Sequence, residues 1–257
     1  MSPEQTSNLH QFFESSLHKK AEEQVFEANR FKFKIENPSA LTKVFDPQQL
    51  DKPLIFILSG PTESGKSTFG QTLAGDKIAT RFKILKHVRE LLETDVFVPP
   101  PQVQKDDPTG YLTYVKTLPE PEILRIGDIL VSTTAQKLES WDTPIAVIET
   151  VSHTWVINAF KNDQSVRALS IFLDPIRSLR IKREAEKEKI SIQAAQQIID
   201  IKDTSKSAAG LWECRTLSDI YVQNSGIIDE YCKFIRELGS YAMNTTRKFN
   251  GIPFEYK

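Results

Sequence analysis

The sequence is poor in cysteine and has no long apolar run. Its two cysteines, Cys214 and Cys232, fit neither a disulfide framework nor the paired Cys/His spacing of a zinc site. The longest strongly apolar run, at 54–58, falls far short of the roughly 20 residues that span a bilayer. The first residues include several acids and lack the apolar segment of a secretory signal. We therefore expect a cytoplasmic protein with reduced thiols and no membrane partner.

An excess of either charge is also missing. The chain of 257 residues has 33 Lys and Arg against 34 Asp and Glu, which gives a net charge of −1. A balanced chain has no overall attraction to duplex nucleic acid, although local basic clusters are compatible with this total. The length falls between one large domain and two small ones, and it is enough to bury a sizeable core.

From residue 52 onward, short apolar runs alternate with longer helical patterns. The runs lack strict alternation of apolar and polar residues, which is typical of strands buried on both faces. Strand and helix in turn predict a mainly parallel central sheet between helices, a three-layer α/β/α fold. The predicted strands lie at 54–59, 82–85, 145–149, 168–173 and 220–223.

Three segments differ from this pattern. Residues 1–50 combine phenylalanines with many charges and no glycine, and we expect an N-terminal helical extension there, in part extended. Within the domain at 51–240, the proline-rich residues 94–121 predict a loop or lid insertion, either functional or a variable surface insertion. We expect residues 241–257 to form a C-terminal tail.

One motif carries most of the chemistry. Residues 60–67 match G-x-x-x-x-G-K-[ST], with an apolar strand before them and a helical pattern after them. Glycines allow the tight turn, Lys66 can neutralise phosphate oxygens, and the Ser67 hydroxyl can bind Mg²⁺. The predicted phosphate-binding residues are Gly60, Pro61, Thr62, Glu63, Ser64, Gly65, Lys66, Ser67 and Thr68.

A second acidic position lies at the end of a neighbouring strand. The apolar run 145–149 ends in Glu149, where a Mg²⁺ ligand or a base is placed in proteins with such a loop. A solvated carboxylate at a strand terminus is the alternative. His153 follows shortly afterwards, and we expect it to cap or pack against a helix rather than to act in catalysis.

Three features together resemble the P-loop nucleoside and nucleotide kinases, among them dephospho-coenzyme A kinase and the nucleoside monophosphate kinases. The first is the loop with its upstream strand. The second is the strand at 169–173, followed by Asp174-Pro175 and a basic helix. The third is the S-D-I-Y-V-Q-N-S-G stretch at 218–226, which is similar to the segment before the family's last helix. The features span about residues 52–240 in the family's order.

The resemblance implies a P-loop NTPase fold that uses ATP and Mg²⁺ and transfers a phosphoryl group to a small-molecule acceptor. Charge must be cancelled over the moving group, and Arg180 and Arg183 lie one helical turn apart. A solvated charged helix is the alternative for them. The implied roles are catalysis by Lys66, Arg180, Arg183 and Glu149, metal binding by Ser67 and Glu149, nucleotide contacts by Asn224 and Gly226, and acceptor binding by Arg89, with weaker candidates at Lys86, Arg177, Arg125 and Asp128.

The sequence also departs from the family and leaves alternatives. Glu63 replaces a small residue of the loop, and the strand 145–149 lacks an Asp-Arg or Asp-Gly pair. No N-K-x-D motif supports a regulatory GTPase. We expect an ATP-dependent phosphotransferase for a nucleoside-like or nucleotide-like acceptor; a non-catalytic nucleotide-binding module or an ATPase is the alternative. The acceptor and the oligomeric state stay open.

Overall fold

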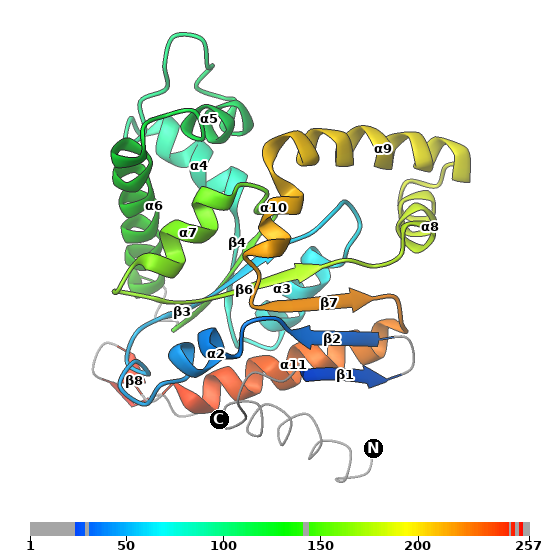
Figure 1. The fold of residues 1–257 in the computed structure, drawn as a ribbon, viewed down its shortest axis with the longest axis horizontal. Coiled ribbons are helices and arrows are strands. Elements are labelled where there is room, and N and C mark those ends of the chain that lie inside the picture. The colour runs from blue at the N-terminus through cyan, green and yellow to red at the C-terminus, as the bar shows by residue number, and fades with distance from the viewer. Residues whose placement is uncertain (1–23, 29–30, 141–143, 247, 250–251, 254–257) are drawn as a thin grey trace.

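The computed structural model describes residues 24–28, 31–140, 144–246, 248–249 and 252–253. A seven-stranded sheet with the order β1-β2-β7-β6-β3-β5-β4 forms its centre (Figure 1). Strands β4, β5, β3, β6 and β7 run parallel to one another. These parallel strands are β3 (Leu54–Ser59), β4 (Thr80–Lys83), β5 (Ile145–Glu149), β6 (Arg167–Leu173) and β7 (Ile220–Asn224).

Helices cover both faces of the sheet, which confirms the three-layer α/β/α fold. Along β3, Phe56 and Leu58 belong to one core cluster, and Ile55 and Ile57 belong to the other, so both faces of the strand are buried. The first cluster includes residues of α2 (Pro38–Val44), α3 (Lys66–Gly75) and α11 (Ile228–Thr245). The second includes residues of α4 (Ile84–Glu93), α5 (Pro108–Val115), α6 (Glu120–Ser140), α7 (Thr154–Asn162) and α10 (Leu211–Thr216).

A helical hairpin projects from the end of β6. It consists of α8 (Arg177–Glu188) and α9 (Ile192–Ala209), which share a small apolar cluster of their own. Figure 1 shows the hairpin beyond the carboxyl ends of the parallel strands, on the side of the molecule where β3 leads into α3. The hairpin therefore lies over the edge of the sheet that carries the motif.

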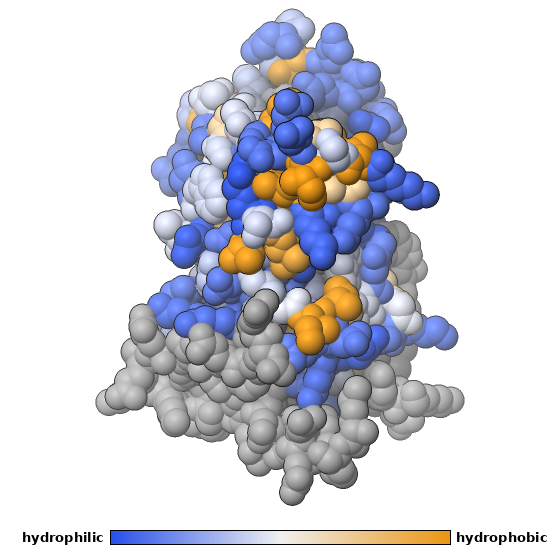
Figure 2. Space-filling model, turned by 90° about the vertical axis from the view of Figure 1, so that its right-hand side faces the viewer, coloured by the Kyte–Doolittle hydropathy of each residue, from blue (hydrophilic) through white to orange (hydrophobic). Residues whose placement is uncertain are grey.

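On the face seen in Figure 2, the apolar surface forms separate patches among hydrophilic side chains.

The predicted strands agree with the structure to within a residue at four positions. The runs at 54–59 and 145–149 are confirmed, and β6 and β7 each extend one residue beyond the prediction. The strand predicted at 82–85 is displaced, because β4 ends at Lys83 and α4 begins at Ile84. Residues 84 and 85 are helical rather than extended, because Ile84, Val88 and Leu91 fall on one buried face of α4.

The N-terminal extension, predicted to be helical and in part extended, is extended rather than helical in its described part before residue 36. Residues Gln24–Ala28 and Phe31–Ile35 form strands β1 and β2, and β2 pairs antiparallel with β7. In β2, Phe33 and Ile35 are buried in the core, and Lys32 and Lys34, which alternate with them, are partly exposed. This period of two is the pattern of a half-buried strand. Residues 1–23 lie outside the described part.

The prediction of a loop at 94–121 holds only for its first half. Helix α5 begins at Pro108, and α6 begins at Glu120. Asp107 caps α5, since its Oδ1 accepts a hydrogen bond from the Gly110 N–H at 2.8 Å, and proline suits the first helical turn. Tyr111 and Leu112 then bury the inner face of the helix.

Replacement of Asp107 by alanine tests this helix. We expect the Asp107→Ala variant to lose about 1 kcal/mol of unfolding free energy in urea, because the side-chain cap of an α-helix is removed. The neighbouring exposed Asp106→Ala is the matched control and should change the unfolding free energy by less than about 0.5 kcal/mol. Equal losses in the two variants would contradict the cap.

The predicted boundary before the C-terminal tail is also wrong. Helix α11 continues through residue 240 to Thr245, because Tyr241, Ala242 and Met243 pack into the core. Two short strands follow, β8 (Lys248–Phe249) and β9 (Ile252–Pro253), which pair with each other. Among the described residues, no helix combines the length and apolarity needed to cross a membrane.

Candidate phosphate-binding site

The turn between β3 and α3 is fixed by two glycines. Gly60 has a φ of 136°, and Gly65 has a φ of 100°, both in the region that favours glycine. A Cβ atom at Gly60 would overlap the carbonyl oxygen of Leu173, and one at Gly65 would lie 2.5 Å from Nδ2 of Asn224. Glu63 adopts a φ of 57° without being glycine. The turn therefore packs closely against the ends of β6 and β7.

Lys66 lies at the centre of this turn. Its Nζ donates hydrogen bonds to the carbonyl oxygens of Gly60 and Pro61, both at 2.7 Å, and to Oγ of Ser64 at 2.9 Å. Burial lowers the pKa of Lys66 well below its ordinary value, and the nearby cation Lys206 lowers it further. The three hydrogen-bond acceptors of this ammonium are neutral oxygens, and the carboxylates of Asp203, Glu63 and Glu149 only partly oppose the lowering of its pKa. A phosphate would add a direct counter-charge.

Glu149 lies at the end of β5, beside the start of α3. Its side chain is fully buried, so the alternative of a solvated carboxylate is excluded. Ser67 Oγ donates to Glu149 Oε2 at 3.3 Å, and Nη2 of Arg81 donates to the same oxygen at 3.0 Å. Arg81 Nε pairs with the other oxygen, Oε1. Gly70 leaves room for this carboxylate, because a Cβ at that position would overlap Oε1 of Glu149.

These oxygens suit a hard cation. Among the described residues, no group of three or more His, Cys, Asp or Glu side chains could hold a metal by itself. Ser67 and Glu149 nevertheless offer a hydroxyl and a carboxylate next to each other. Mg²⁺ is commonly held by one or two protein oxygens and completed by substrate phosphates, so this donor set fits it.

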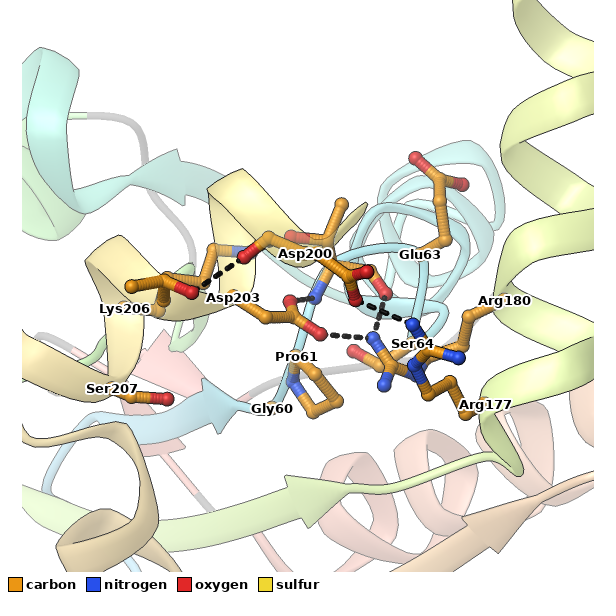
Figure 3. Close-up of polar contacts among 12 residues, drawn as sticks. Gly60, Pro61, Glu63, Ser64, Arg177, Arg180, Asp200, Asp203, Lys206 and Ser207 are labelled. Carbon is orange, nitrogen blue, oxygen red and sulfur yellow. Dashed lines mark hydrogen bonds and ion pairs between the residues drawn. The ribbon is translucent and has the colours of Figure 1, made fainter. Parts of the chain in front are cut away.

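Two basic residues of α8 reach the loop. Arg180, which Figure 3 shows beside the loop, donates from Nη1 to the carbonyl oxygen of Thr62 at 3.3 Å. Arg183 Nη1 donates to the carbonyl oxygen of Glu63 at 3.2 Å. Burial lowers the pKa of the Arg183 guanidinium. The alternative of a fully solvated helix is therefore wrong for these two residues. Arg177 instead forms an exposed ion pair with Asp200 at 2.5 Å.

Helix α9 adds two residues that the sequence did not single out. Asp203 Oδ1 accepts a hydrogen bond from the Thr62 N–H at 2.9 Å, and Lys206 Nζ donates to Thr62 Oγ1 at 2.8 Å. Burial lowers the pKa of Lys206 to about 8, and Asp203 opposes this effect. Asp203 and Lys206 stand one turn apart in a mixed charge run, so only the tertiary fold marks them. The sequence around Arg81 also gives no signal of a role, because β4 is short and carries no motif.

The segment after β7 braces the loop from the other side. Asn224 Nδ2 donates to the carbonyl oxygen of Ser64 at 3.2 Å, and the Tyr231 hydroxyl donates to that of Gly65 at 3.1 Å. Gly226 follows β7 and is partly exposed. The structure thus brings the side chain of Asn224 against the loop, and a contact with a nucleotide by Asn224 and Gly226 stays a prediction.

The acceptor candidates lie apart from this cluster. Arg89 and Lys86 are on the exposed side of α4, so the role of Arg89 stays a prediction. His153 is buried beside the start of α7, as expected for a packed side chain, and burial lowers its pKa to about 4. Arg125 and Asp128 are exposed on α6, so their roles also stay predictions. Gly127 between them lets α6 approach α7 closely, since a Cβ there would lie 2.8 Å from Cβ of Ala159.

No protein-family model matches the chain, and no curated protein sequence matches it either. Several solved structures are similar. An uncharacterized protein from Eubacterium ventriosum ATCC 27560 is 12% identical with a TM-score of 0.44, and the alignment covers 73% of this chain and 98% of that one. Dephospho-CoA kinase from Campylobacter jejuni is 13% identical, with a TM-score of 0.35 and coverage of 73% and 96%. Shikimate kinase from Acinetobacter baumannii in complex with shikimate is also 13% identical, with a TM-score of 0.38 and coverage of 75% and 96%.

Proposed function

We propose that this protein is an ATP-dependent phosphotransferase that acts on a small nucleoside-like or nucleotide-like acceptor. The observation that carries the proposal is the gathering of cationic side chains from three elements around one glycine-framed loop. Lys66 belongs to α3, Arg180 and Arg183 belong to α8, and Lys206 belongs to α9. Buried and partly buried cations of this density favour a multivalent anion as ligand.

Each group has a task that follows from phosphoryl transfer. The reaction spreads negative charge over the moving group, so its rate depends on positioned positive charge. Lys66 would contact the terminal phosphates, and Arg180 and Arg183 would close over them from α8. Ser67 and Glu149 would hold Mg²⁺, which when bound offsets the charge of the phosphate oxygens. Arg81 fixes the Glu149 carboxylate through two hydrogen bonds.

Arg89 is the candidate for a contact with an anionic group of the acceptor, and Asn224 and Gly226 are candidates on the nucleotide side. An acceptor hydroxyl or phosphate oxygen would attack the terminal phosphoryl group, and ADP would leave. The proposed reaction is that of a kinase, with the acceptor still to be identified.

The test is an acceptor screen with ATP and Mg²⁺, read out as ADP release. We expect release to rise when the correct nucleoside, nucleotide or related acceptor is added. Arg183→Met should reduce this turnover by ~100-fold, since it removes a charge at the loop. Lys182→Met is the matched control, because Lys182 is exposed and pairs with Glu186. Tight ATP binding without turnover for any acceptor would favour the non-catalytic binding module instead.

A further inference from the structure

A carboxylate of the protein itself lies on the phosphate-binding loop. Asp203 of α9 accepts the Thr62 N–H through Oδ1, and its Oδ2 forms an ion pair with Arg180 (Figure 3). Only 17% of the Asp203 side chain is exposed. Backbone N–H groups of such a loop are the donors that bind phosphate oxygens. Asp203 therefore holds a negative charge where an anionic ligand would compete for the same donor.

Thr62 is held by the hairpin through all of its polar groups. Its N–H bonds to Asp203, its hydroxyl accepts from Lys206, and its carbonyl oxygen accepts from Arg180. Burial alone would raise the pKa of Asp203, but the Thr62 N–H and Arg180 together lower it. The carboxylate is thus kept charged against the loop at neutral pH.

Within the part of the chain that the structure describes, Arg180 has an unpaired buried donor that an anion could accept from. The residue is 6% exposed, and one of its guanidinium nitrogens, Nε, is buried without a hydrogen-bond partner among the described residues. A buried guanidinium usually satisfies its donors with carboxylate or phosphate oxygens. Asp203 engages one Arg180 nitrogen, Nη1, which leaves Nε as a donor for a second oxyanion.

We infer that Asp203 is an internal competitor of the terminal phosphate for Thr62 and Arg180. The α8–α9 hairpin then acts as a latch: its Asp203 contact with Thr62 breaks when a phosphate chain reaches Thr62. Asp203 thereby sets the preference of the loop between triphosphate and diphosphate. This inference rests on the proposed function, because it requires the loop to bind a phosphate chain. Removal of the Asp203 charge favours the longer chain, since the repulsion is greatest for the phosphate nearest Asp203.

The test compares Asp203→Asn with Asp200→Asn in the full chain. Both changes remove one negative charge from α9, but Asp200 faces the exposed Arg177 and not the loop. Calorimetry would measure binding of inorganic tripolyphosphate, ATP and ADP with Mg²⁺. We expect Asp203→Asn to bind tripolyphosphate and ATP about tenfold more tightly than the wild type, with a smaller gain for ADP, and Asp200→Asn to change each affinity by less than about threefold.

Amide hydrogen exchange tests the contact without a ligand. Loss of the carboxylate in Asp203→Ala should speed exchange of the Thr62 amide, whereas Asp200→Ala should leave it unchanged; circular dichroism shows whether each variant is folded. Unchanged or weaker triphosphate binding in a folded Asp203→Asn variant overturns the inference. Tighter tripolyphosphate binding combined with no turnover for any acceptor supports the latch and overturns the kinase. No binding of any probe to either protein overturns both.

Discussion

Replacement of Lys66 by methionine should lower the rate of phosphoryl transfer by ~100-fold or more. Methionine keeps most of the aliphatic stem and removes the ammonium group. In the structure this group is buried and bonded to three oxygens of its own loop, with its pKa lowered by burial. A bound phosphate chain would add a direct counter-charge, so the interaction would strengthen with the charge that develops during transfer.

Lys187→Met is the control for this experiment. Lys187 also belongs to the basic hairpin and pairs with the Glu63 side chain at 3.0 Å, but 54% of its side chain is exposed. An exposed ion pair is worth 0–1 kcal/mol, so we expect less than about a fivefold loss of rate. ADP release in the presence of an acceptor measures both variants. Wild-type turnover by a folded Lys66→Met protein would contradict the assignment of the loop.

Replacement of Asp219 by alanine should cost about 3–5 kcal/mol of unfolding free energy. Asp219 is fully buried just before β7, and its Oδ1 pairs with Lys161 Nζ at 2.6 Å. Oδ2 accepts hydrogen bonds from the Ser170 N–H at 2.9 Å and from Ser170 Oγ at 2.7 Å. Alanine would leave the Lys161 ammonium and the Ser170 amide without this acceptor, which is far more costly than loss of an exposed pair.

Urea unfolding measures the Asp219 effect against two controls. The exposed Asp200→Ala should lose less than about 1 kcal/mol. In a double mutant, Lys161→Met combined with Asp219→Ala should recover part of the loss, because the partly buried cation that lost its partner is removed. A loss below about 1 kcal/mol in Asp219→Ala would show that the contacts of Asp219 with Lys161 and Ser170 do not stabilise the fold. Equal losses in the single and double mutants would contradict the ion-pair explanation.

The parts of the fold that the sequence predicts are those encoded locally. The run 54–59 and the motif after it specify strand, turn and helix within about twenty residues, so both are confirmed. Strand β2 was predictable in principle, because Phe33 and Ile35 alternate with lysines, but the period of two covers only five residues. Its place in the sheet depends on β7, near the other end of the chain.

The site was predictable where a motif fixes it and hidden where the tertiary fold builds it. Lys66 and Ser67 follow from the loop motif, and Glu149 follows from its position at a strand end. Asp203 and Lys206 look like ordinary surface charges of a helix, and their approach to Thr62 depends on the turn between α8 and α9. No local pattern encodes that turn's direction.

The pairing of β2 with β7 has a consequence for synthesis of the protein. Phe31 lies opposite Asn224, so β2 leaves the ribosome long before its partner strand exists. At 5–20 residues per second, the delay is roughly 10–40 s, much longer than a helix or hairpin needs to form. During this interval Phe33 has no finished sheet to join. The strand that bears Asn224 therefore completes the core and the support of the glycine-framed loop in the same late step of folding.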